Sequence, residues 1–67
     1  PFQALSTREF EIVCLLAEGL SVNAIANRLA LSYKTVANYA TQIKSKLEVD
    51  TSAELTRLAI RHGLVRA

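Results

Sequence analysis

The side chains best suited to chemistry lie within residues 33–47, where lysines, amides and hydroxyls recur at helical spacing. At 100° per residue these polar side chains gather on one side of a helix. They are Lys34, Asn38, Thr41 and Ser45, with Gln42 beside them and Lys44 and Lys46 on the two flanks. The segment holds three lysines and no acid. Because a solvated helix face usually mixes Glu with Lys, this face indicates contact with a negatively charged partner.

The chain has few residues suited to catalysis or metal binding, since it holds one cysteine, Cys14, and one histidine, His62. Together they cannot supply a zinc set or a nucleophile, base and orienting acid. We expect Cys14 to be a partly exposed small filler rather than a redox sensor. We expect His62 to have a structural or capping role near a helix end. No enzymatic activity, metal or cofactor is expected.

Length and composition predict one small domain. The chain has 67 residues, of which 51% are apolar, and a net charge of +2. No apolar run approaches the roughly 20 residues that a membrane span needs. A single cysteine cannot form an internal disulfide, which fits a reducing cytoplasmic setting. Because the first residue is Pro1 rather than Met, we expect residues 1–67 to be one domain of a longer protein.

Helical periodicity without strand alternation predicts an all-α fold of four helices. The predicted N-caps are Ser6, Ser21, Ser32 and Thr51. Glu9 and Glu54 each follow an N-cap by three residues, a spacing that predicts capping boxes at the first and fourth helices. Gly19 is placed to end the first helix in a left-handed cap. The third helix is predicted from Tyr33 to Leu47 and the fourth from Thr51 to Gly63.

Helices two and three are predicted to form a helix-turn-helix, because only Ala30, Leu31 and Ser32 separate them. The expected apolar contacts of this unit are Ile25, Leu29, Leu31, Val36 and Tyr39, with Ala26 small where the helices approach. Along the third helix the buried stripe is predicted to be Val36, Ala40, Ile43 and Leu47. Ala30 occupies the turn position where glycine is favoured. A left-handed conformation there would cost a non-glycine residue about 1–2 kcal/mol.

A longer set of residues resembles the helix-turn-helix domain of the LuxR (GerE-like) family, as carried by NarL/FixJ-type response regulators. The matching residues are Leu5-Ser6, Arg8-Glu9, Leu16-Ala17, Gly19-Leu20-Ser21, Ile25-Ala26, Leu29, Leu31-Ser32, Lys34-Thr35-Val36, Ile43, Lys46-Leu47, Val49 and Gly63-Leu64. The resemblance implies a four-helix DNA-binding domain with a tri-helical core and a C-terminal dimerisation helix. It also implies that the third helix is the recognition helix and that a receiver domain lies upstream.

The chain departs from the family pattern at four positions. Ala37 and Tyr39 stand where many members place a lysine and a histidine, so the base preference should differ from theirs. Ala24 stands where an acidic residue is common. Glu48 follows the third helix where glycine is usual. None of these changes alters the predicted fold.

The partner predicted by this pattern is double-stranded DNA. Asn38 and Thr41 are predicted to read bases, since Asn pairs bidentately with adenine and Thr offers a hydroxyl and a methyl group. Ala37 is a third predicted base contact. The predicted phosphate contacts are Lys34, Thr35, Gln42, Lys44, Ser45 and Lys46, which would position the protein without reading sequence. Alternatively, Lys46 lies along the domain's own surface, and Tyr39 is either core edge or a backbone contact through its hydroxyl.

The fourth helix is predicted to carry a dimer interface of Ala53, Thr56 and Ile60. Its apolar stripe is Leu55, Leu58, Ala59 and His62, and Ile60 falls off that stripe without an obvious internal partner. The alternative is a single exposed isoleucine. The patch is small, so we expect a monomer that forms a homodimer on DNA. The alternative function for the whole chain is a helical protein-interaction module that does not bind DNA.

Overall fold

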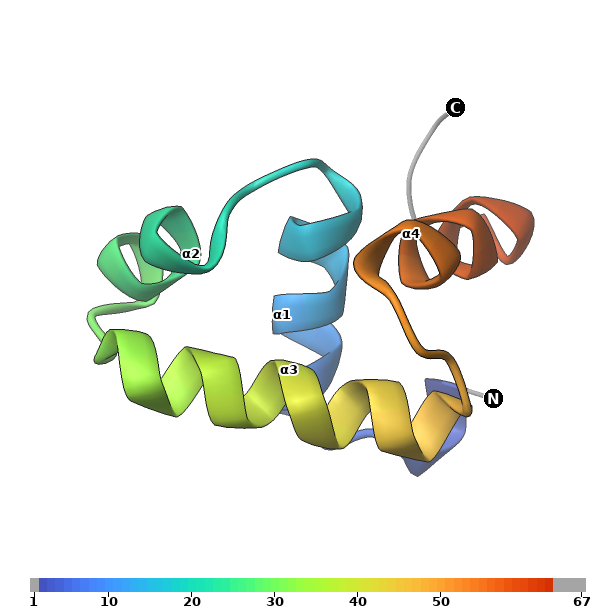
Figure 1. Ribbon diagram of the computed structural model, residues 1–67, viewed down its shortest axis with the longest axis horizontal. Helices are drawn as coiled ribbons and strands as arrows, with labels where there is room; N and C mark the ends of the chain where they lie inside the picture. The colour runs from blue at the N-terminus through green and yellow to red at the C-terminus, as the bar shows by residue number, and fades with distance from the viewer. Residues whose placement is uncertain (1, 64–67) are drawn as a thin grey trace.

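The computed structural model describes residues 2–63, which form a short 3₁₀ turn followed by four α-helices (Figure 1). The elements are η1 (Phe2–Ala4), α1 (Thr7–Ala17), α2 (Val22–Leu29), α3 (Tyr33–Leu47) and α4 (Ser52–Arg61). No strand occurs among these residues, and the all-α prediction is confirmed. The predicted family match at Leu64 lies outside the described residues. No helix within residues 2–63 has both the length and the apolar character to cross a bilayer.

All four predicted N-caps form. In each case the cap hydroxyl accepts a hydrogen bond from the backbone N–H three residues later. The full capping box appears at α1, where Ser6 Oγ accepts from the Glu9 N–H and Glu9 Oε1 accepts from the Ser6 N–H at 2.8 Å. The box predicted at α4 is wrong in its second half, because Glu54 Oε1 faces the Thr51 hydroxyl at 3.5 Å instead of the Thr51 N–H.

Helices α1, α2 and α3 end in the same way, with a left-handed residue and two backbone hydrogen bonds that close the last turn. Gly19 has this role after α1, with φ of 98°, as predicted. Ala30 after α2 and Glu48 after α3 both have φ of 57° and ψ of 41°. After α2, the N–H of Leu31 bonds to the carbonyl of Ala26 at 2.9 Å, which is the long bond of a Schellman motif. Ala30 thus adopts the left-handed conformation, a question that the sequence left open, and Glu48 adopts the same conformation.

The fourth helix ends earlier than predicted, at Arg61 instead of Gly63. His62 is its C-cap residue, and the backbone N–H of His62 bonds to the Leu58 carbonyl at 3.1 Å. The His62 and Phe2 rings form a T-shaped contact, with centroids 5.4 Å apart. These contacts agree with the structural or capping role expected for His62.

One hydrophobic core joins the four α-helices. Its fully buried large side chains are Ile12, Val13, Ile25, Val36, Ile43 and Leu55. Helix α1 passes through the centre and contacts α2, α3 and α4. Ala26 is buried in the core, while Leu29, Leu31 and Tyr39 are half-buried against it, in agreement with the predicted helix-turn-helix contacts. This packing fixes α3 along one edge of the molecule.

Candidate nucleic-acid interface

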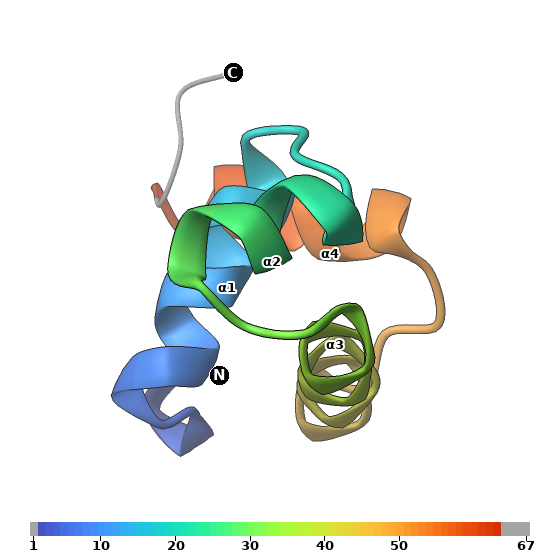
Figure 2. The same cartoon turned by 90° about the vertical axis from the view of Figure 1, so that its left-hand side faces the viewer.

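Helix α3 presents a long side that no other helix covers. Viewed almost end-on, α3 has the other three helices on one side only (Figure 2). Its buried residues are Val36, Ala40, Ile43 and Leu47, the four predicted from the hydrophobic pattern. Because these residues recur at helical spacing, one rotation of α3 about its axis buries all four together. That rotation turns the opposite, polar side to solvent.

The predicted base-reading residues lie on this uncovered side. Asn38 and Thr41 are exposed, and Ala37 is half-buried. The Thr41 hydroxyl donates to the Ala37 carbonyl at 3.1 Å, which fixes its rotamer. In that arrangement the hydroxyl oxygen still has a free lone pair and can accept a hydrogen bond. Within residues 2–63 the Asn38 amide has no hydrogen-bond partner, so both its donor and its acceptor remain available.

The predicted phosphate contacts lie on the same side and its flanks. Lys34, Gln42 and Ser45 are exposed, and Lys44 is half-buried. Neither Lys34 nor Lys44 forms an ion pair with any residue from 2 to 63. Their ammonium groups are therefore free to meet an anion.

Thr35 is held in place by the cap of α3. Its hydroxyl oxygen accepts a hydrogen bond from the Ser32 hydroxyl at 2.8 Å, while Ser32 Oγ accepts from the Thr35 N–H. Since Ser32 donates in this pair, the hydrogen of the Thr35 hydroxyl remains free to donate to another acceptor. The capping network thus orients one hydroxyl donor at the N-terminal end of α3.

Among the lysines of α3, Lys46 is the one that forms an ion pair with another residue in the range 2–63. Its Nζ lies 2.8 Å from Oε1 of Glu9, across a separation of 37 residues in sequence. The Glu9 side chain is only 4% exposed, whereas the Lys46 side chain is 43% exposed. The hydrogen bond from Lys46, assisted by the Ser6 N–H, holds the pKa of Glu9 below its usual range. Lys46 thus lies along the domain's own surface, which was the alternative left open by the sequence.

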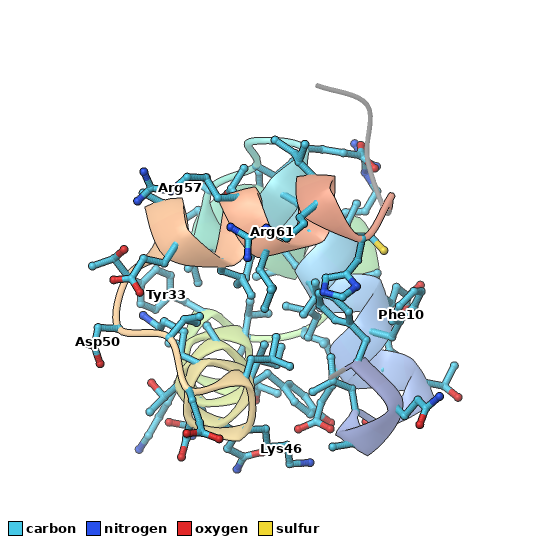
Figure 3. The ribbon with its side chains drawn as sticks, turned by 90° about the vertical axis from the view of Figure 1, so that its right-hand side faces the viewer. Phe10, Tyr33, Lys46, Asp50, Arg57 and Arg61 are labelled. Atoms are coloured by element: carbon cyan, nitrogen blue, oxygen red, sulfur yellow. The ribbon has the colours of Figure 1, made fainter. Side chains whose placement is uncertain are left out.

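The two flanks of α3 are distinct. Figure 3 looks along this helix and shows Tyr33 and Lys46 on different sides of it. Lys46 is on the side that faces α1, and its ion pair with Glu9 connects α3 to α1. The uncovered polar side lies between these flanks, so the candidate contacts form one continuous surface on a single helix.

The residues predicted to form a dimer interface lie together on α4, apart from the α3 surface. Ala53 is exposed, while Thr56 and Ile60 are half-buried. The Thr56 hydroxyl donates to the Ser52 carbonyl at 2.9 Å. Leu55 on the same helix is part of the core cluster and Leu58 packs against it, whereas Ile60 does neither.

Three surface hollows formed by residues 2–63 are lined by residues outside α3. An open groove of about 700 Å³ lies between α1 and α2, lined partly by Phe10, Cys14 and Leu29. Cys14 is half-buried, as predicted, and burial together with the nearby Glu18 raises the pKa of its thiol. A raised pKa lowers the thiolate fraction and argues against a reactive cysteine. No cluster of three potential metal ligands occurs in residues 2–63.

Comparison with known proteins agrees with this arrangement of helices. Residues 3–59 match the family described as bacterial regulatory proteins, luxR family (GerE). The chain belongs to the luxR family. The resemblance predicted from the sequence is therefore confirmed. As a luxR-family domain with four helices, the chain is a DNA-binding domain of a bacterial transcription regulator.

The luxR-family relatives include a transcriptional activator and response regulators. Transcriptional activator protein ExaE of Pseudomonas putida is 50% identical over 64 residues, covering 96% of this chain and 30% of that protein. Response regulator UvrY of Escherichia coli is 48% identical over 67 residues, covering 100% of this chain and 31% of UvrY. Response regulator GacA of Pseudomonas protegens is 45% identical over 67 residues, covering 100% of this chain and 32% of GacA. The luxR-family chain thus spans less than a third of the length of these relatives.

Proposed function

We propose that this domain binds duplex DNA sequence-specifically by inserting α3 into the major groove. The observation that carries the proposal is the uncovered side of α3, a 15-residue helix with three lysines and no acid. A major groove about 12 Å wide admits one α-helix with its side chains. The other three helices lie on the opposite side of α3, so none of them obstructs this approach (Figure 2).

Within this complex Asn38 and Thr41 read base edges. The free amide of Asn38 can donate to N7 of adenine and accept from the exocyclic amine of the same base. The Thr41 methyl group can contact the methyl group of thymine. Ala37 contributes a small apolar contact beside them. The absence of a longer side chain at Ala37 leaves space that a base or a water molecule can occupy, which supports a base preference different from that of family members with lysine there.

The phosphates are bound by lysines and by oriented hydroxyls. Lys34 and Lys44 are unpaired within residues 2–63, and Thr35 presents a hydroxyl donor at the N-terminus of α3. Gln42 and Ser45 add neutral donors. An ammonium group has three donors, so Lys46 can contact a phosphate without releasing Glu9. The positive end of the α3 dipole adds to this attraction.

We further propose that the domain is the output domain of a two-component response regulator in the bacterial cytoplasm. This second proposal rests on two observations. The relatives UvrY and GacA are named response regulators, and this chain covers 30–32% of the length of the relatives. An upstream receiver domain would then control DNA binding. The α4 residues Ala53, Thr56 and Ile60 would pair two domains on DNA. The contact is too small for a stable free dimer, since such interfaces bury more than about 1,200 Å² in total.

The decisive experiment is a binding titration with duplexes selected from a random pool. Asn38→Ala should weaken binding to the selected site by about 1–3 kcal/mol and leave binding to an unrelated duplex nearly unchanged. Lys44→Ala should weaken both and reduce the slope of log K against log salt by about one. Equal losses on both duplexes in Asn38→Ala would show that Asn38 does not read bases.

The alternative, a helical protein-interaction module, makes the opposite prediction for the unmodified domain. Several phosphate contacts release counterions, so DNA affinity should fall steeply as salt rises. Absence of duplex binding at low salt, with the domain at high concentration, would favour the protein-interaction function.

A further inference from the structure

Tyr33 is an aromatic residue that lies outside the hydrophobic core. It is the first residue of α3, and 58% of its surface is exposed. The other large exposed apolar residue in residues 2–63 is Phe10, at 39%, and its ring forms a T-shaped contact with that of Phe2, with centroids 6.4 Å apart. Tyr33 has no such aromatic partner in this part of the chain. More than half of the surface of Tyr33 is therefore in contact with solvent.

The cap of α3 does not require Tyr33 either. The hydrogen bonds at this end join Ser32 with Thr35, and no atom of the Tyr33 side chain takes part. The first position of a helix has no strong preference for an aromatic side chain. Tyr33 consequently contributes neither to the core nor to the helix start.

The position of Tyr33 places it beside the proposed DNA surface. The first turn of a recognition helix is the part that reaches furthest toward the bases. At 100° per residue Tyr33 shares a flank of α3 with Ala37 and Lys44, whereas Lys46 lies on another side (Figure 3). When the polar side of α3 enters a groove, its two flanks face the two sugar-phosphate walls.

We propose that Tyr33 is a further DNA contact, which donates its phenol O–H to a phosphate oxygen on the wall that Lys44 also faces. This inference rests on the proposed function. Tyrosine hydroxyls are regular donors to phosphate, and such contacts position the protein without reading sequence. Ala37, one turn along the same flank, has too short a side chain to cover the ring. The ring face is therefore available to pack on an adjoining deoxyribose.

A rigid aromatic donor suits this position. Tyrosine has two side-chain torsions, so ordering it on binding loses less conformational freedom than ordering a lysine. Tyr33 and Lys44 lie eleven residues apart, which at a rise of 1.5 Å per residue is about 16.5 Å along the axis. Two contacts this far apart on one flank fix both the depth and the tilt of α3 in the groove.

The test compares Tyr33→Phe and Tyr33→Ala with Phe10→Ala as the matched control for loss of an exposed aromatic. Tyr33→Phe should weaken binding about tenfold on the selected and the unrelated duplex alike, and Tyr33→Ala should weaken it further. Because no charge is removed, the salt slope should remain that of the parent, in contrast to Lys44→Ala. Phe10→Ala, on α1, should bind as the parent does, and circular dichroism should show that all the variants are folded.

The outcomes separate this inference from the proposed function. Parent-like binding by Tyr33→Phe, with the parent domain binding duplex DNA, would overturn the Tyr33 contact alone. An equal loss in Phe10→Ala would also overturn it, since the effect would then not be specific to the α3 flank. Failure of the parent domain itself to bind a duplex would overturn the proposed function.

Discussion

Replacing Ala30 by glycine should stabilise the domain, because Ala30 holds a left-handed conformation that glycine adopts without strain. Its φ of 57° and ψ of 41° lie in the region where the Cβ approaches the following carbonyl oxygen. Ala30 is exposed, so removing its methyl group leaves no cavity. The backbone hydrogen bonds of the turn, including Leu31 N–H to the Ala26 carbonyl, do not depend on the side chain.

The expected gain follows from two opposing terms. The left-handed conformation costs a non-glycine residue about 1–2 kcal/mol. Glycine gives the unfolded chain more conformational freedom, which lowers stability by about 0.4–1 kcal/mol. The middle of each range leaves a net stabilisation of about 0.8 kcal/mol, and the most favourable combination leaves about 1.6 kcal/mol. For a domain of this size that raises the melting temperature by about 4–8 °C per kcal/mol.

The assay is thermal and urea unfolding followed by circular dichroism. The matched control is Ala37→Gly in the middle of α3, where the backbone is helical and glycine should lower stability by about 1 kcal/mol. Glu48→Gly tests the same reasoning at the other end of α3, since Glu48 has the same φ and ψ and is exposed. A neutral or destabilising Ala30→Gly, with Ala37→Gly destabilising, would refute the strain argument.

Two further predictions concern the ion pair of Lys46 and the outer surface of α4. The pKa of Glu9 is lowered in the folded domain, so the contribution of Glu9 to stability is complete above the ordinary value of 4.5 and is lost as the pH falls through the lowered value. Glu9→Gln should therefore flatten the acid limb of a stability–pH curve measured by urea unfolding. An unchanged acid limb would contradict the role of the pair. Ile60→Glu should reduce cooperative occupancy of a duplex with two half-sites about one helical turn apart. Its affinity for a single half-site should stay close to that of the parent, and unchanged cooperativity would place the dimer contact elsewhere.

The helices and their starts could be predicted because their signals are local. Each N-cap hydroxyl bonds to a backbone N–H three residues away, so the serines and the threonine at these positions mark helix starts wherever the helices later pack. The turn of Ala30, Leu31 and Ser32 is equally local. The buried stripe of α3 followed from residue spacing, and that stripe in turn determined which side of α3 faces solvent.

The composition of the candidate site was predictable for the same reason, since Asn38, Thr41 and Lys34 lie opposite the buried stripe on one helix. Their individual roles in contacting bases or phosphates remain predictions. The position of Ile60 off the apolar stripe also followed from spacing, and the structure places it outside the core cluster. Its part in a dimer remains a prediction.

Tertiary structure alone decided which distant side chains meet. The sequence gives Glu9 a local capping role, but its second partner, Lys46, lies 37 residues away and is brought within 2.8 Å by the packing of α3 on α1. The contact of Phe2 with His62 joins the two ends of the described chain in the same way. Such contacts depend on how far each helix is rotated and shifted against its neighbour. That arrangement is fixed by the whole core, in which side chains from four helices must fill one volume together, and not by any window of neighbouring residues.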